Sequence, residues 1–146
     1  MDNRQKKPDR LNVSQRAQEI IDRIDEKNYF CLGKESINRS ELFLFAMALG
    51  VDTVPTKLDN VHAGGLILDK SIDSATLANM YALSIAELGE DKLDDVMDKY
   101  EVYRKAQEYA NTGFLNIEDY MQNYSAEELA WEILSEMDQQ YEDIVG

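Results

Sequence analysis

The sequence is poor in the residues that cross-link chains and build many catalytic centres. Cys31 is its single cysteine, so neither a disulfide within the chain nor a cysteine-rich zinc site is possible. His62 is its single histidine, and any mechanism that needs an imidazole must use it. The phosphate-loop, G-x-G-x-x-G, H-E-x-x-H and EF-hand patterns are all missing. We therefore expect a protein that is not an enzyme and holds no cofactor or metal.

Long apolar segments are missing as well. The first ten residues are polar and charged and lack the apolar core of a signal peptide. The apolar stretch 42–49 is much shorter than the about 20 residues that cross a membrane. We therefore expect a cytoplasmic protein with no membrane contact. Residues 1–9 are predicted to form a flexible arm and residues 10–146 a single domain.

Basic residues are scarce beyond the first forty positions. Residues 1–40 hold nine Lys/Arg against seven Asp/Glu, whereas residues 41–146 hold six against 22, within a net charge of -14. An acidic body repels nucleic-acid phosphates and anionic membranes. It is suited to a basic protein partner or to imitating the charge of DNA. The simpler alternative is an acidic surface that serves only solubility.

Two local features could carry chemistry, and each has a simpler explanation. His62 precedes Ala63-Gly64-Gly65, where backbone N–H groups could approach a ligand, but a histidine beside glycines is commonly an ordinary turn residue. Asp94 and Asp98 are four residues apart and could share a divalent cation. Acidic residues at the start of a helix also complement its dipole without any metal, and we favour that explanation.

The spacing of apolar residues predicts a mostly α-helical protein, a compact bundle of about five or six helices. The central helix is predicted over 40–49, with Ser40 as its N-cap and Gly50 just past its end. It is apolar nearly all round, so other helices should pack around it. Five further helices are expected. The first begins at Ser14, the second runs from Ser74 to a stop at Gly89, and the third runs from about Asp91 to a break at Thr112-Gly113. The fourth covers 114–121, and the fifth begins at Ser125. Leu66-Ile67-Leu68 is compatible with a buried strand.

The N-terminal unit suggests one route to DNA. The alternation in Arg10-Leu11-Asn12-Val13-Ser14 predicts a short strand, which two helices follow. This order resembles the ribbon-helix-helix arrangement, in which strands of two chains pair and can enter a DNA groove. The possible nucleic-acid contacts are Lys6, Lys7, Arg10 and Arg16. The alternative is a strand and two helices that merely begin a helical domain.

The last predicted helix is strongly acidic and offers a surface for a protein partner. Its carboxylates could dock a basic partner, although a solvated face is the alternative. The possible partner-binding residues are Glu128, Glu132, Glu136 and Tyr141.

Two phrases of the sequence resemble a known family. Residues 41–51 read Glu-Leu-Phe-Leu-Phe-Ala-Met-Ala-Leu-Gly-Val, and residues 108–114 read Glu-Tyr-Ala-Asn-Thr-Gly-Phe. They resemble the F-A-A-A-L-G and E-Y-A-N-x-G segments of small accessory proteins associated with bacterial DNA phosphorothioation and related anti-phage defence islands. The resemblance implies a non-catalytic subunit that works beside an ATPase or a nuclease, and it supplies no catalytic residues.

Three hypotheses follow for the function. The first is a non-catalytic accessory subunit of a prokaryotic anti-phage DNA-defence complex, which acts by protein–protein binding. The second is an acidic DNA mimic that inhibits a DNA-binding protein. The third is a dimeric DNA-binding protein that uses the N-terminal strand. A homo-oligomer is a further possible assembly, and the third hypothesis requires one.

Overall fold

The described part of the chain forms four continuous α-helices and a small antiparallel sheet. The computed structural model describes residues 9–26, 38–51, 53–88 and 98–125 together with positions 128, 129, 131, 132, 135, 138, 139 and 142. In order, the elements are β1 (Arg10–Leu11), α1 (Gln15–Glu26), α2 (Arg39–Val51), β2 (Ile67–Leu68), the single-turn helix η1 (Asp69–Ser71), α3 (Ser74–Leu88) and α5 (Lys99–Asn123). The mostly helical class is confirmed, but the five or six helices are not matched. Residues 27–37 and the expected helix start at Asp91 lie outside the described residues.

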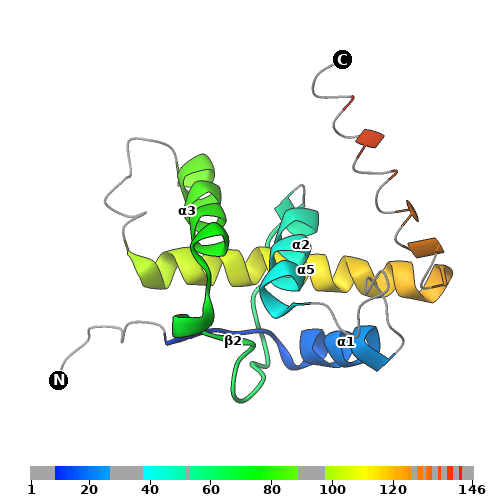
Figure 1. Ribbon diagram of the computed structural model, residues 1–146, viewed down its shortest axis with the longest axis horizontal. Coiled ribbons are helices and arrows are strands. Elements are labelled where there is room, and N and C mark those ends of the chain that lie inside the picture. The colour runs from blue at the N-terminus through cyan, green and yellow to red at the C-terminus, as the bar shows by residue number, and fades with distance from the viewer. Residues whose placement is uncertain are drawn as a thin grey trace.

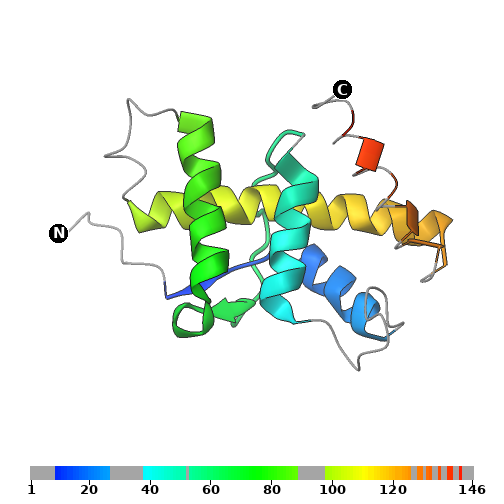
Figure 2. The ribbon, with the colours of Figure 1, turned by 45° about the horizontal axis from the view of Figure 1, so that its top comes forward.

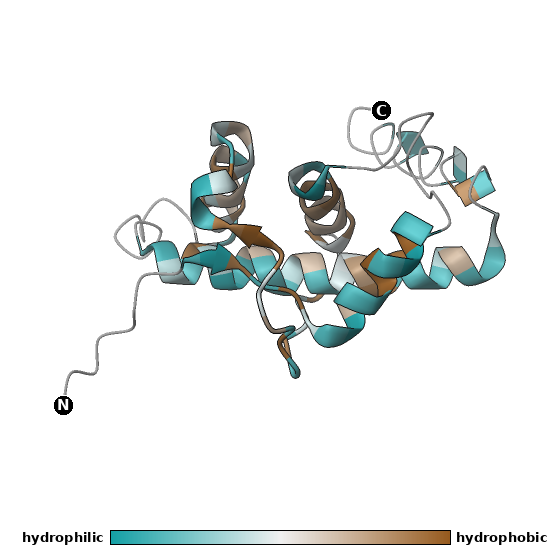
Figure 3. Cartoon of the chain, turned by 60° about the horizontal axis from the view of Figure 1, so that its bottom comes forward, coloured by the Kyte–Doolittle hydropathy of each residue, from teal (hydrophilic) through white to brown (hydrophobic). Residues whose placement is uncertain are grey.

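The helices are arranged around α5, the longest element. In Figure 1, α2 and α3 rise from α5, while α1 and the two strands lie below it. Figure 2 shows the same crossing from another side, with α2 and α3 standing side by side across α5. The apolar colouring gathers on α2 and on β2, whereas much of α5 alternates between polar and apolar residues (Figure 3). The large, fully buried side chains that join these elements include Leu11, Ile20, Ile21, Ile24, Leu42, Phe43, Met80, Tyr103, Phe114 and Ile117.

The prediction that a break at Thr112-Gly113 separates two helices is wrong, because α5 continues through both residues. Gly113 instead allows α2 and α5 to approach closely. A Cβ atom on Gly113 would overlap the backbone O and C atoms of Ala46 and lie 2.8 Å from its Cα atom. Glycine inside a helix carries a cost of about 1 kcal/mol relative to alanine. Here the missing side chain is what lets the two backbones meet.

Gly50 has the same role on the opposite helix. It was expected just past the end of the central helix, but α2 includes it and ends at Val51. A Cβ atom on Gly50 would overlap the carbonyl oxygen of Tyr109 and lie 3.2 Å from the nitrogen of Gly113. The central helix is therefore packed mainly on α5, and its buried residues include Leu42, Phe43, Ala46 and Met47.

Two of the predicted helix caps are confirmed. The Ala17 backbone N–H donates to Ser14 Oγ over 3.0 Å, which caps α1 as expected. The Glu128 backbone N–H donates to Ser125 Oγ over 3.3 Å, as expected of a cap three residues before a glutamate. The described positions from 128 to 142 are helical.

Two other caps are shifted by one or two residues. Asn38, not Ser40, caps α2, because Asn38 Oδ1 accepts from the Ser40 backbone N–H over 2.8 Å. Asp73, not Ser74, caps α3, and its carboxylate accepts from the Thr76 backbone N–H over 2.7 Å. Asparagine and aspartate are at least as favourable as serine at this position, so two capping residues close together in sequence left the start ambiguous.

The N-terminal strand is confirmed over Arg10–Leu11, but its partner lies in the same chain. β1 pairs antiparallel with β2, so that Arg10 faces Leu68. Just past β1, the Asn12 backbone N–H donates to Gln107 Oε1 of α5 over 2.7 Å. A ribbon-helix-helix ribbon would need a strand of a second chain beside β1. One edge of β1 is held by β2, and the backbone that follows it is tied to α5.

Candidate functional site

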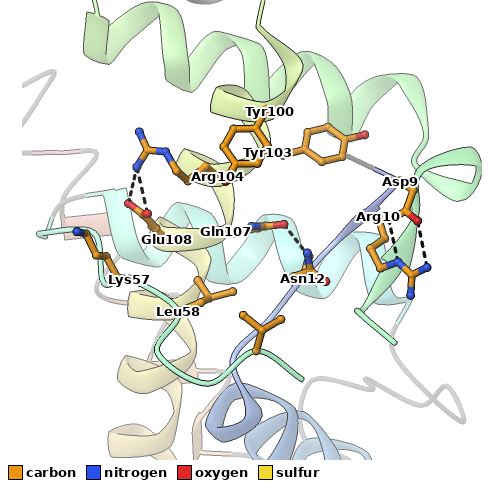
Figure 4. A pocket seen from close by; sticks show the side chains of 11 residues that line it. Asp9, Arg10, Asn12, Lys57, Leu58, Tyr100, Tyr103, Arg104, Gln107 and Glu108 are labelled. Atoms are coloured by element: carbon orange, nitrogen blue, oxygen red, sulfur yellow. Dashed lines mark hydrogen bonds and ion pairs between the residues drawn. The ribbon is translucent and has the colours of Figure 1, made fainter. Parts of the chain in front are cut away.

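A cleft of about 660 Å³ opens where β1, the 57–61 loop and the first turns of α5 meet (Figure 4). Binding sites for small molecules commonly have volumes of this order. Its lining side chains are Asp9, Arg10, Asn12, Lys57, Leu58, Val61, Tyr100, Tyr103, Arg104, Gln107 and Glu108. The residues from α5 recur at helical spacing and therefore form one wall of the cleft.

The loop on one side of the cleft is fixed to α5 by partly buried hydrogen bonds. Asn111, which is buried, donates through Nδ2 to the carbonyl oxygens of Thr56 and Lys57 over 3.2 and 3.3 Å. Thr112 Oγ1 donates to the Val54 carbonyl over 2.8 Å. The Thr56 N–H donates to the Glu108 carbonyl over 3.1 Å. The backbone that carries Lys57 is thus positioned before any ligand arrives.

Asn111 also connects this loop to α1. Its Oδ1 accepts from Ser14 Oγ over 2.8 Å, and Ser14 in turn caps α1. Because buried polar groups are costly unless they are paired, this network holds three segments in one arrangement.

Most charges of the cleft are paired within the protein. The Arg10 guanidinium donates to the Asp9 carboxylate over 3.0 and 3.2 Å, and this bond lowers the pKa of Asp9. Arg104 pairs with Glu101 over 2.6 Å and with Glu108 over 3.1 Å. The bond to Glu101, with smaller contributions from Glu108, raises the pKa of Arg104. Figure 4 shows the Arg104–Glu108 pair on the wall formed by α5.

Lys57 differs from the other cations of the cleft. Its ammonium group is exposed, and it forms no ion pair with any side chain in the described part of the chain. The same is true of Lys70, which lies in η1 and does not line the cleft.

Beside the cleft, a small charged cluster fixes the start of α5 to η1. Tyr103 donates its hydroxyl to the Asp69 carboxylate, which also pairs with Lys99 Nζ over 2.6 Å. The Lys99 ammonium lies 5.4 Å from the centre of the Tyr103 ring. Lys99 and then Tyr103 lower the pKa of Asp69 by hydrogen bonding. Burial, followed by the bond to Asp69, raises the pKa of Tyr103.

The possible nucleic-acid contacts do not form one basic patch among the described residues. Arg10 pairs with Asp9 at the cleft, whereas Arg16 on α1 pairs with the buried Glu118 of α5. Glu118 also accepts from Arg23, so it links two arginines of α1 to α5. Lys6 and Lys7 lie outside the described residues.

The other candidate chemical groups have structural partners. His62 Nδ1 shares a hydrogen bond of 2.9 Å with Gln15 Oε1. Asp98 caps α5 by accepting from the Tyr100 N–H over 3.1 Å, and Asp94 lies outside the described residues. Within the part of the chain that the structure describes, no group of three His, Cys, Asp or Glu residues could hold a metal ion.

The acidic C-terminal segment exposes an aromatic residue that we did not predict. The side chain of Trp131 is 69% exposed, while Leu129 is fully buried. Glu128 is exposed and Glu132 is half-buried. The predicted partner-binding residues Glu136 and Tyr141 lie outside the described residues. Trp131 is the only tryptophan of the chain, and this was the sequence signal that could have identified it as a candidate binding residue.

Among the helices described, none combines the length and the apolar character needed to cross a membrane. Comparison with known proteins gives no family for this chain: no family model, no curated protein and no solved structure matches it.

Proposed function

We propose that the chain is a non-catalytic, protein-binding subunit whose acidic C-terminal segment docks on a basic surface of its partner. The observation that carries the proposal is the exposure of Trp131 beside Glu128 and Glu132. Tryptophan is among the residues that contribute most to binding energy when a partner buries them. Carboxylates around such an anchor steer a basic partner and favour the correct orientation.

The charge of the last third of the chain supports this choice of partner. Lys105 is the last basic residue, so the 41 residues from 106 to 146 contain ten Asp/Glu and no Lys/Arg. A basic protein would meet no like charge along this segment. The nearest basic residues in the sequence are Arg104 and Lys105, close to the start of α5.

The proposed setting is a prokaryotic anti-phage DNA-defence complex, with an ATPase or a nuclease subunit as the partner. This setting rests on the resemblance of residues 41–51 and 108–114 to accessory proteins of such systems. It is a narrower proposal than protein binding itself, and the two can be tested separately.

The test is co-purification of the tagged chain with the products of its neighbouring genes, followed by binding measurements on the purified pair. We expect Trp131→Ala to weaken binding at least tenfold, because anchor tryptophans commonly contribute 2 kcal/mol or more. Val54→Ala is the matched control, since Val54 is 78% exposed but lies outside the acidic segment. Equal losses in both variants, or no loss in Trp131→Ala, would reject this docking surface. A partner unrelated to defence would reject only the setting.

A second candidate function is inhibition of a DNA-binding protein by imitation of DNA. The long run without basic residues favours it, because its carboxylates present negative charge to a DNA-binding protein as phosphates do. In that case duplex DNA competes with the chain for the partner, and binding weakens steeply with salt. Binding that persists in excess duplex DNA would exclude the mimic and leave the accessory subunit.

A further inference from the structure

We infer that the cleft between β1, the 57–61 loop and α5 is a second binding site, for a monocarboxylate that carries an apolar or aromatic group. This site is separate from the C-terminal segment, and its test does not depend on the proposed function. The argument rests on one unpaired cation, the ring of Tyr100 with two aliphatic side chains, and a backbone that is already held in place (Figure 4).

The charge of the cleft favours a ligand that carries one negative charge. Three basic and two acidic side chains line it, a formal excess of one positive charge in a chain whose net charge is -14. Arg10 and Arg104 already hold carboxylates of the protein. Lys57 is therefore the cation that remains for a ligand, and an ammonium pairs well with a single carboxylate.

The remaining walls suit a flat or apolar group. Leu58 and Val61 come from the loop, and the half-buried ring of Tyr100 comes from the first turn of α5. Figure 4 shows Tyr100 among the side chains that line the cleft. Aromatic rings provide a large contact area for another ring. A carboxylate at Lys57 would thus leave the rest of its molecule against tyrosine and aliphatic side chains.

A polyanion fits the same surface poorly. Phosphate groups are recognised best by unpaired arginines or by converging backbone N–H groups. Here both arginines are occupied, and Asp9 and Glu108 would repel additional negative charge. The strongly acidic body of the protein would repel the flanking phosphates of an oligonucleotide as well.

Two features make the site ready for its ligand. The Lys57 backbone is bonded through its carbonyl to Asn111, and Gln107 holds the Asn12 backbone on the opposite wall. A site that is organised beforehand loses less conformational entropy when a ligand binds.

The test is a titration of the full chain with N-acetylphenylalanine as the probe. Binding is monitored through the chemical shifts of the backbone amides. Its neutral counterpart, N-acetylphenylalanine amide, is the control for the carboxylate. We expect saturable shifts at Asn12, Lys57 and Tyr100 with the acid, and binding at least tenfold weaker with the amide. Lys57→Gln should lower the affinity for N-acetylphenylalanine about tenfold, because it removes one charge-assisted contact. Lys70→Gln is the matched control and should bind as the wild type does.

The outcomes separate the alternatives. Failure of the acid to bind, equal binding of acid and amide, or an unchanged affinity in Lys57→Gln would each overturn the inference. A tetrapeptide that ends in phenylalanine is the second probe, and tighter binding of that peptide than of the amino acid would identify a chain terminus as the source of the carboxylate. Preferential binding of the dinucleotide d(TpT) would show that the cleft binds nucleic acid rather than a carboxylate, and it would overturn the inference. Circular dichroism and the melting temperature report whether each variant keeps its fold.

Discussion

Substitution of Gly113 by alanine is the sharpest test of the fold, because two effects on stability have opposite signs. In an exposed helix, this change stabilises by about 1 kcal/mol. At Gly113 the new Cβ atom would overlap the backbone of Ala46, and no side-chain movement can relieve that overlap. The two helices must therefore separate, and α2 carries Phe43 and Leu42, both fully buried.

The expected loss follows from the contacts that would loosen. Forcing extra volume into a packed interior costs about 1–3 kcal/mol and sometimes more, and a gap of 0.5–1 Å forfeits a quarter to a half of each dispersion contact. Because the obstacle is backbone, we take about 4 kcal/mol for the packing loss and subtract about 1 kcal/mol for helix propensity. The net destabilisation is about 3 kcal/mol. For a chain of this size, that lowers the melting temperature by about 6–12 °C.

The assay is urea unfolding followed by circular dichroism, with thermal melting as a second measurement. A Gly113→Ala protein that is as stable as the wild type, or more so, would refute the close crossing of α2 and α5. The double variant with Ala46→Gly adds a control. It should not restore stability, because the overlapping atoms of Ala46 belong to the backbone.

Three further predictions concern polar groups. Asn111→Ala should destabilise by about 2 kcal/mol in urea unfolding because it leaves buried partners unpaired, whereas Asn123→Ala, at an exposed helical position, should change stability little. Glu118→Gln should cost about 1–2 kcal/mol, since two arginines of α1 lose a nearly buried carboxylate, and an unchanged unfolding midpoint would contradict this. Because the folded-state pKa of Asp69 is lowered, its stabilisation is complete above its unfolded value near pH 4 and is lost as the pH falls through the folded value. Acid titration of Asp69→Asn should lack that part of the decline, and an identical acid profile would show that its pairing with Lys99 and Tyr103 is unimportant.

Local signals predicted the helical class and several helix starts because those signals lie within one turn. Ser14 could be identified as a cap from its place before an apolar helical pattern, and its hydroxyl indeed accepts from Ala17. Asn38 and Ser40 are both good caps, and the sequence offered no local reason to choose Asn38. The choice depends on tertiary packing, since Ser40 is buried in the folded chain.

Gly50 and Gly113 were misinterpreted for a different physical reason. A glycine that ends a helix and a glycine that admits another backbone have the same local sequence signature. Only the partner helix distinguishes them, and the two glycines are 63 positions apart in sequence. The cleft was beyond prediction for a similar reason. Lys57 lies in an irregular loop whose position is determined by hydrogen bonds to Asn111 of α5.

The crossing of α2 and α5 also gives a structural role to residues 41–51 and 108–114, the two segments that carry the family resemblance. Ala46 and Gly50 belong to the first phrase, and Tyr109 and Gly113 belong to the second, and these residues meet at the crossing. Any chain that brings two helices this close needs small residues at the same places. The resemblance therefore bears more directly on the packing of α2 against α5 than on chemistry. Function should therefore depend on side chains outside these two segments. Lys57 and Trp131 are two such side chains, since both are exposed and the packing of the helices does not require them.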